Sequence, residues 1–136
     1  MGKCIRVSDG DTITIMYNGE KVRVRLYGID APEKGQDFSK KASSFVYDLC
    51  QNKQVRVEVK GTDQYKRVLG VVYAGSVNVN EELLKNGLAW RYKYNKDKHY
   101  LELQNQAKSK KLGLWSDKNP IDPWQYRKDK KKKSIK

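Results

Sequence analysis

Two short acidic segments stand out in a chain that is otherwise strongly basic. They are Asp-Gly-Asp-Thr at residues 9–12 and Ile-Asp-Ala-Pro-Glu at residues 29–33, in a chain with a formal net charge of +13. A basic protein attracts phosphate polymers, and carboxylates grouped inside that field indicate a metal ion held against a bound phosphate. The chemistry that these residues favour is therefore hydrolysis of a phosphodiester.

Asp11 and Asp30 are the candidate metal ligands. Each is expected at the edge of a strand, where a turn can bring the two carboxylates to one point. Oxygen donors without His or Cys select a hard ion, Ca²⁺ or Mg²⁺, and a backbone carbonyl near Asp30 with waters would complete the shell. The alternative for Asp9-Gly10-Asp11 is an ordinary turn, because Asp and Gly dominate turns.

Glu33 and two arginines are the candidates for the chemical step. Pro32 fixes the backbone before Glu33 and aims its carboxylate, which could take a proton from water. Arg25 and Arg67 suit a phosphate clamp, because a guanidinium meets two phosphate oxygens at once and never loses its charge. The alternative for each of the three is a charged side chain on the surface.

The N-terminal third reads as three strands. The segments that alternate apolar and polar residues are 4–7, 12–17 and 21–27. Asn18-Gly19 between the last two predicts a tight hairpin. Because alternate residues share a face of a strand, Val22, Val24 and Leu26 lie together. Arg25 is then on the other face, either toward solvent or toward a site.

Helices and two further strands follow. Helical periodicity and end signals predict helices at about 38–51, with Asp37 or Ser39 as cap, at 80–87, capped by Asn80, and at 97–111, and alternation predicts strands at 54–60 and 68–73. Three strands, a helix and two strands are the order of the oligonucleotide- and oligosaccharide-binding (OB) barrel. We predict a mixed β and α fold, a five-stranded Greek-key OB barrel with three helices.

The chain is expected to form one domain over residues 1–126, including a Trp- and Pro-containing extension from about residue 116. Residues 127–136 hold seven basic and one acidic side chain. Such a run repels itself, so we expect a disordered tail that is either simply solvated or attracts phosphates. An anionic membrane surface is an alternative partner for this tail.

Composition narrows the remaining options. No apolar run approaches 18 residues and no leader is recognisable, so we expect neither a membrane span nor an export signal in this sequence, although a signal could have been removed upstream. The compartment stays open. His99 is the single histidine, which argues against zinc. Cys4 and Cys50 are expected to be buried and unpaired rather than a disulfide, and a monomer is the default.

Five motifs in order resemble the staphylococcal nuclease family. They are Asp-Gly-Asp-Thr, Arg-Leu-x-x-Ile-Asp-Ala-Pro-Glu, Asp-x-Tyr-x-Arg, Gly-Leu-Ala and Leu-Gly-Leu-Trp-Ser, and the resemblance spans residues 3 to about 116. The family's barrel agrees with the strand order above. The resemblance implies a Ca²⁺-dependent nuclease that cuts DNA and RNA at the 5′ P–O bond and leaves 3′-phosphate ends.

The resemblance also implies roles for individual residues. Asp11, Asp30 and the main-chain oxygen of Ala31 would hold Ca²⁺, with Asp9 behind them. Glu33 would be the general base, and Arg25 and Arg67 would bind the scissile phosphate. The implied contacts to the nucleotide come from Tyr65, near a terminal phosphate, and from Tyr92 or Tyr94, near the base, although packing is an equal alternative for the last two.

Some positions depart from the family pattern. Lys66 stands where the family often has Gly, Gln64 replaces a frequent Lys, and the loop of residues 34–39 is short.

The competing hypothesis is a catalytically silent OB module that binds nucleic acid or protein. Such a module is expected to lack the acids, the base or the arginines, and this sequence has all of them.

Overall fold

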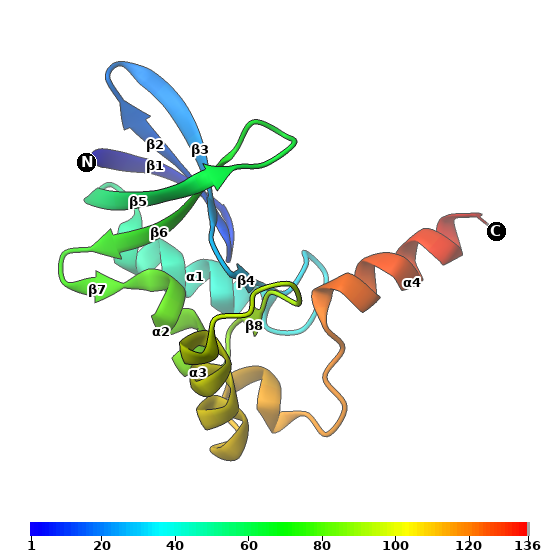
Figure 1. Cartoon of the computed structure of the whole chain (residues 1–136). Coiled ribbons are helices and arrows are strands. Elements are labelled where there is room, and N and C mark those ends of the chain that lie inside the picture. Colours follow the sequence, from blue (N-terminus) through cyan, green and yellow to red (C-terminus); the bar gives the residue numbers. More distant parts are fainter. Residues whose placement is uncertain (136) are drawn as a thin grey trace.

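Five strands form a closed barrel in the computed structural model, which describes residues 1–135 and the side chains of residues 1–131 (Figure 1). The strands are β1 (Gly2–Asp9), β2 (Thr12–Tyr17), β3 (Glu20–Leu26), β5 (Gln54–Thr62) and β6 (Val68–Ala74). Antiparallel pairs run in the order β3-β2-β1-β5-β6, and a parallel pairing of β3 with β6 closes the barrel. The predicted five-stranded barrel is confirmed.

The β2–β3 hairpin follows from its turn residues. Asn18 and Gly19 have φ angles of 50° and 79°, and Tyr17 pairs with Glu20 across them. Positive φ at both central residues matches the twist of the flanking strands. On β3, Val24 and Leu26 are buried in the core.

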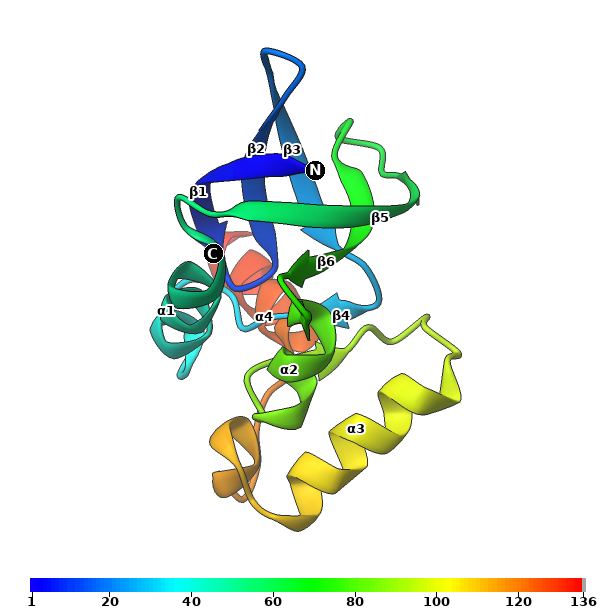
Figure 2. The ribbon, with the colours of Figure 1, turned by 90° about the vertical axis from the view of Figure 1, so that its left-hand side faces the viewer.

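Short strands and helices complete the domain. They are β4 (Ile29–Asp30), β7 (Val77–Asn78), β8 (Trp90–Arg91), α1 (Ser39–Cys50), α2 (Val79–Lys85), α3 (Lys98–Ser109), a 3₁₀ helix (Gly113–Ser116) and α4 (Pro123–Ile135). The described chain thus has a fourth α-helix beyond the three predicted. Figure 2 shows α2 and α3 beyond the same end of the barrel. No helix in the described residues has the length and apolar character that a bilayer crossing requires.

Helix α1 packs against the loop that carries the acids. A Cβ atom at Gly10 would lie 2.7 Å from the Cβ of Ala42 and 2.9 Å from that of Ala31, so only glycine permits this approach. The predicted cap is wrong, because neither Asp37 nor Ser39 caps the helix. Phe38 is the N-cap residue, with a left-handed φ of 71° and no side-chain hydrogen bond to the helix.

Asn80 has a different role from the predicted cap. Asn78 is the N-cap of α2 and accepts a hydrogen bond from the Glu81 N–H. Asn80 is fully buried, and its Oδ1 accepts from the Val72 N–H at 3.1 Å. Its Nδ2 donates to the carbonyl oxygens of Tyr27 at 2.9 Å and Gly70 at 3.3 Å. One side chain therefore ties α2 to β6 and to the segment that follows β3.

The segment after α3 packs back on the domain. Trp115 is buried, and its ring lies edge-on to that of Trp90 with centroids 4.5 Å apart. Cys4 and Cys50 are both buried and free, as expected. Burial raises the pKa of the Cys50 thiol to about 12, with a smaller contribution from the neighbouring Cys4, so this thiol stays protonated at neutral pH.

Residues 127–135 belong to helix α4, whereas the sequence predicted a disordered tail from residue 127. The helix begins at Pro123, a favoured first position, and Asp122 accepts a hydrogen bond from the Gln125 N–H at 2.7 Å. The ammonium of Lys93 lies 3.6 Å from the centre of the Trp124 ring. Because lysine is a good helix former, anchoring at the first turn extends the helix through a run of like charge. Figure 1 shows α4 leading away from the barrel.

Candidate functional site

A cavity of about 830 Å³ brings together most of the site residues predicted from the sequence. Those that line it are Asp9, Asp11, Arg25, Glu33, Tyr65, Arg67, Tyr92 and Tyr94. Asp30 and Ala31 are buried, and Asp30 accepts a hydrogen bond from Arg25, which lines the cavity. Motifs far apart in the sequence therefore meet in one place.

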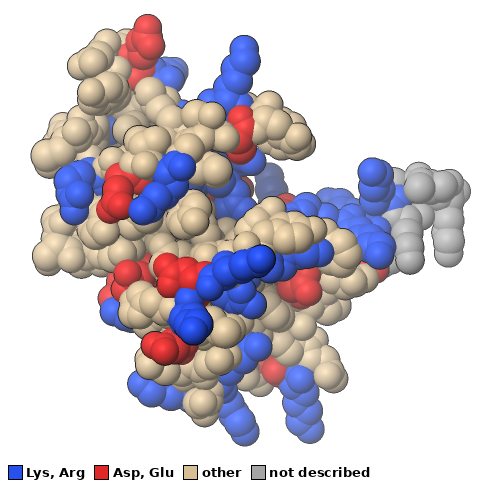
Figure 3. Space-filling model, in the orientation of Figure 1, with Lys and Arg blue, Asp and Glu red and all other residues tan. Residues whose placement is uncertain are grey.

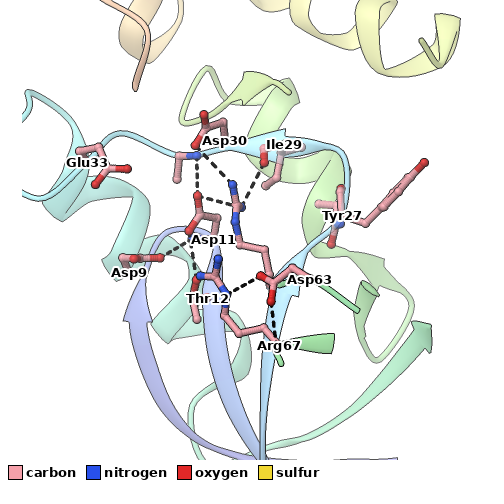
Figure 4. Close-up of polar contacts among 12 residues, drawn as sticks. Asp9, Asp11, Thr12, Tyr27, Ile29, Asp30, Glu33, Asp63 and Arg67 are labelled. Carbon is pink, nitrogen blue, oxygen red and sulfur yellow. Dashed lines mark hydrogen bonds and ion pairs between the residues drawn. The ribbon is translucent and has the colours of Figure 1, made fainter. Parts of the chain in front are cut away.

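Arg25 connects the two predicted metal ligands. Its Nη1 lies 2.9 Å from Asp11 Oδ2, and its Nη2 lies 3.4 Å from Asp30 Oδ1. Nη1 also donates to the carbonyl oxygen of Ile29 at 3.1 Å (Figure 4). The side chain is 15% exposed, so the outer face of β3 at this position is turned into a site and not toward solvent.

Asp11 is fixed by donors on both oxygens. Oδ2 also accepts the Ala31 N–H at 2.9 Å, and Oδ1 accepts the Thr12 hydroxyl at 3.2 Å. Burial alone would raise the pKa of Asp11, but the Arg25 charge and these hydrogen bonds hold the pKa below its usual value. Asp11 is therefore ionised at neutral pH.

Asp9 and Asp30 both have a pKa above the usual value. Asp9 Oδ1 accepts the Asp11 N–H at 3.0 Å. Burial and the neighbouring Asp11 carboxyl raise the pKa of Asp9 to about 7. Burial also raises the pKa of Asp30, although Arg127 and Arg25 both act against it. Acids whose charged forms are disfavoured in this way would be stabilised by added positive charge.

The donors at this point fit a hard cation that keeps several waters. Asp11 and Asp30 offer carboxylate oxygens, the ligand type that Ca²⁺ and Mg²⁺ prefer. Within the described residues, no three side chains of His, Cys, Asp or Glu gather closely enough to hold a metal ion. Two carboxylates would therefore need water, phosphate or backbone oxygens to complete the shell.

Glu33 pairs with Arg127, a partner that no sequence pattern predicted. Its carboxylate Oε1 accepts from Nη1 of Arg127, and Nη2 of Arg127 lies 3.2 Å from Asp30 Oδ2. The Gln36 side chain accepts the Glu33 N–H at 2.8 Å and holds the start of the loop. Arg127 lines the cavity although it belongs to α4, 94 residues beyond Glu33.

Asp63, for which no role was predicted, orients Arg67. Asp63 Oδ2 lies 2.7 Å from Arg67 Nε, and Asp63 Oδ1 accepts the N–H groups of Tyr65 and Arg67 at 2.9 Å. The signal was present in the quoted motif, in which an acid precedes the arginine by four residues across a turn. Lys66 has φ of 62°, which explains why a glycine is favoured at this position.

The three predicted substrate tyrosines surround the same cavity. Tyr65 and Tyr94 are well exposed, at 62% and 67%, and Tyr92 is 37% exposed. The rings of Tyr92 and Tyr94 lie with centroids 5.6 Å apart. The Arg67 guanidinium lies 5.5 Å from the centre of the Tyr65 ring. Exposed aromatic faces beside cations are suited to unstacked bases and their phosphates.

Comparisons with known proteins find relatives that are named as nucleases. The family model described as Staphylococcal nuclease homologue matches residues 23–117. A relative named "Uncharacterized endonuclease" from Haemophilus influenzae is 47% identical over 131 residues, which cover 95% of this chain and 74% of the relative. "Micrococcal nuclease" from Shigella flexneri is 39% identical over 142 residues, which cover 96% of this chain and 82% of that protein. "Staphylococcal-like nuclease CAN1" from Arabidopsis thaliana is 38% identical over 113 residues, covering 82% of this chain and 35% of the plant protein.

Proposed function

The chain belongs to the staphylococcal nuclease homologue family and is a nuclease, and from this premise we propose that it hydrolyses DNA and RNA with Ca²⁺. It cleaves the 5′ P–O bond and leaves 3′-phosphate ends. The observation that carries the proposal is that Arg25, Glu33 and Arg67 line one cavity with Asp11, whose carboxylate shares the Arg25 guanidinium with Asp30.

Asp11, Asp30 and the carbonyl oxygen of Ala31 would hold the ion, and Asp9 supports Asp11 through its hydrogen bond to the Asp11 N–H. When bound, Ca²⁺ supplies positive charge that would offset the negative charge on the phosphate oxygens in the transition state. The all-oxygen donors fit Ca²⁺ or Mg²⁺, and the choice of Ca²⁺ follows the family's own cofactor.

Glu33 takes a proton from water as the water oxygen forms a bond to phosphorus. The bond from phosphorus to the 5′ oxygen breaks, and the leaving 5′ oxygen takes a proton from solvent. Arg25 and Arg67 bind the non-bridging oxygens and stabilise the charge that gathers on them in the five-coordinate transition state. Asp63 engages Nε of Arg67, which leaves the two Nη groups to meet phosphate oxygens as a fork. Arg67 thus enters the reaction already oriented.

Tyr65, Tyr92 and Tyr94 bind the nucleotide around this centre. A tyrosine ring stacks on any base and discriminates little between sequences, which suits broad substrate use. A base can stack on an exposed tyrosine ring only when it is not stacked within a duplex. Single-stranded or frayed regions are therefore the favoured substrates.

Release of acid-soluble nucleotides from DNA and RNA tests the proposal. Wild-type protein should release them with Ca²⁺ and should stop when a chelator is added. Glu33→Gln should lower kcat by about 10²- to 10⁴-fold, because the variant keeps the shape of the side chain and loses the base. Arg67→Ala should lower kcat by about 10²-fold or more, because the transition state loses one charge-assisted contact.

Each result separates one part of the proposal from the rest. No release by wild-type protein with Ca²⁺ would favour a silent OB module that only binds nucleic acid. Unimpaired cutting by Glu33→Gln would reject the base assignment and leave the nuclease activity intact. End-group analysis showing 5′-phosphates would place the cleaved bond on the other side of the phosphorus.

A further inference from the structure

Helix α4 brings an arginine onto the acids that the proposed reaction needs. Arg127 pairs with Glu33 through Nη1 and with Asp30 through Nη2. We propose that α4 is an autoinhibitory strap, in which Arg127 competes with the divalent cation for Asp30 and with the attacking water for Glu33. The inference rests on the proposed function of these two acids.

Every carboxylate oxygen of Asp11 and Asp30 already has a partner. Arg25 and the Ala31 N–H share Asp11 Oδ2, and Thr12 donates to Asp11 Oδ1. Arg25 takes Asp30 Oδ1, and Arg127 takes Asp30 Oδ2. A divalent cation would bind through these same oxygens, so it competes with the cationic donors that already occupy them.

Arg127 is the donor that can leave at least cost. Its side chain is 43% exposed, whereas that of Arg25 is 15% exposed. Arg25 is also held by the Ile29 carbonyl oxygen and projects from a strand of the closed barrel. Ion pairs that water can reach are weak, and a guanidinium released to solvent is rehydrated at once.

The same contact bears on the base. The Arg127 guanidinium occupies Oε1 of the Glu33 carboxylate, where it competes with an attacking water. Asp30 and Glu33 are held by one guanidinium, so a single displacement frees both. Entry of the cation and release of the base from its ion pair are therefore coupled through one side chain.

The N-terminal turn of α4 can stay in place while Arg127 moves. Asp122 caps the helix at the Gln125 N–H, and the Lys93 ammonium covers the Trp124 ring. Gln36, from the Glu33 loop, donates to the carbonyl oxygen of Ile121 at 2.9 Å. Release thus requires rotation of one side chain or a small tilt of the helix, with no unfolding of the domain.

Ca²⁺ binding measured by calorimetry tests the strap without relying on activity. The variants are Arg127→Gln, which removes the charge, and Arg127→Lys, which keeps it and loses the fork. Lys110→Gln on the end of α3 removes an equal charge at a site with no contact to these acids, and thermal melting checks the fold of each. Arg127→Gln should bind Ca²⁺ about three- to tenfold more tightly than wild type, Arg127→Lys should lie between, and Lys110→Gln should match wild type.

Nuclease assays at low Ca²⁺ provide the second readout. Arg127→Gln should be faster than wild type when Ca²⁺ is below its dissociation constant, and the difference should shrink as Ca²⁺ saturates. Weaker or unchanged Ca²⁺ binding by Arg127→Gln would overturn the strap. Tighter Ca²⁺ binding in protein that cuts no nucleic acid would sustain the competition and reject the proposed nuclease function instead.

Discussion

Arg67 depends on Asp63 for its orientation. The carboxylate binds the Nε edge of the guanidinium and closes the turn through the N–H groups of Tyr65 and Arg67. Asp63→Asn keeps the shape and removes the charge that holds the arginine. We expect kcat to fall by about tenfold or more with a smaller change in KM, because a misaligned clamp loses more in the transition state than in the ground state.

The pH dependence of stability provides a separate check on Asp63. Burial alone would raise the pKa of Asp63, but the hydrogen bonds from Arg67 and Tyr65 hold the pKa below its usual value. The ionised carboxylate therefore stabilises the fold above the unfolded pKa, and this contribution is lost as the pH falls through the folded pKa. Asp63→Asn should flatten this acid limb in melting experiments, and an unchanged kcat in the variant would show that Arg67 aligns without Asp63.

At the residue level, candidate chemical groups could be chosen from the sequence because each proposed role demands a particular side chain. A hard ion demands carboxylates, and a phosphate clamp demands arginines, so Asp11, Asp30, Arg25, Glu33 and Arg67 could be chosen before any geometry was known. Their Ca²⁺ and catalytic roles remain predictions. The pairing of Arg127 with Glu33 spans 94 residues and leaves no local pattern, which is why the sequence analysis missed it.

At the level of elements, Asn80 joins three segments that position the site. Its amide satisfies the Val72 N–H and the carbonyl oxygens of Tyr27 and Gly70. Asn80→Ala removes this partner from the Val72 N–H and the Tyr27 carbonyl oxygen, whereas the Gly70 carbonyl oxygen keeps the Tyr27 N–H at 2.8 Å. We expect the free energy of unfolding to fall by about 2 to 4 kcal/mol, measured by urea denaturation.

Asn86→Ala is the matched control for this loss. Asn86 is exposed and its Nδ2 donates to the Glu82 carbonyl oxygen at 2.8 Å, near the end of the same helix. Because water can replace that bond, the change should cost less than about 1 kcal/mol. Equal losses in the two variants would mean that the buried network contributes no more than an ordinary helix end.

Strands and helix faces were predictable because alternation and helical spacing follow directly from which face is buried. Helix ends were less so. An aspartate and a serine flank Phe38, yet Phe38 itself takes the left-handed cap conformation, because the loop that delivers Glu33 sets the entry angle of α1. Helix α4 could not be inferred from a lysine run, since its anchors are Trp124 under Lys93 and the acids bound by Arg127.

At the level of the whole molecule, positive charge extends beyond the cavity along α4 (Figure 3). Residues 128–136 contain six lysines and one aspartate. Deleting them spares Arg127 and should weaken binding to single-stranded nucleic acid. The slope of log K against log salt should become shallower by about 1 to 3, because fewer counterions are released on binding.

The Ca²⁺ requirement of this deletion variant should match that of wild type. Binding measured by fluorescence anisotropy at several salt concentrations gives the slope, and chelator titration gives the metal requirement. A slope unchanged by the deletion would mean that the end of α4 makes no contact with phosphates, and loss of cutting at low salt would mean that it takes part in the reaction.

The parallel pairing that closes the barrel has a consequence for the order in which the proposed site forms during synthesis. Arg25 lies within the β3 segment of this pairing, opposite Leu69, and Arg67 immediately precedes the β6 segment. The two arginines therefore converge only after β6 has been synthesised and docked. A nascent chain from which residue 67 has not yet emerged therefore lacks the second arginine of the proposed clamp and cannot complete it.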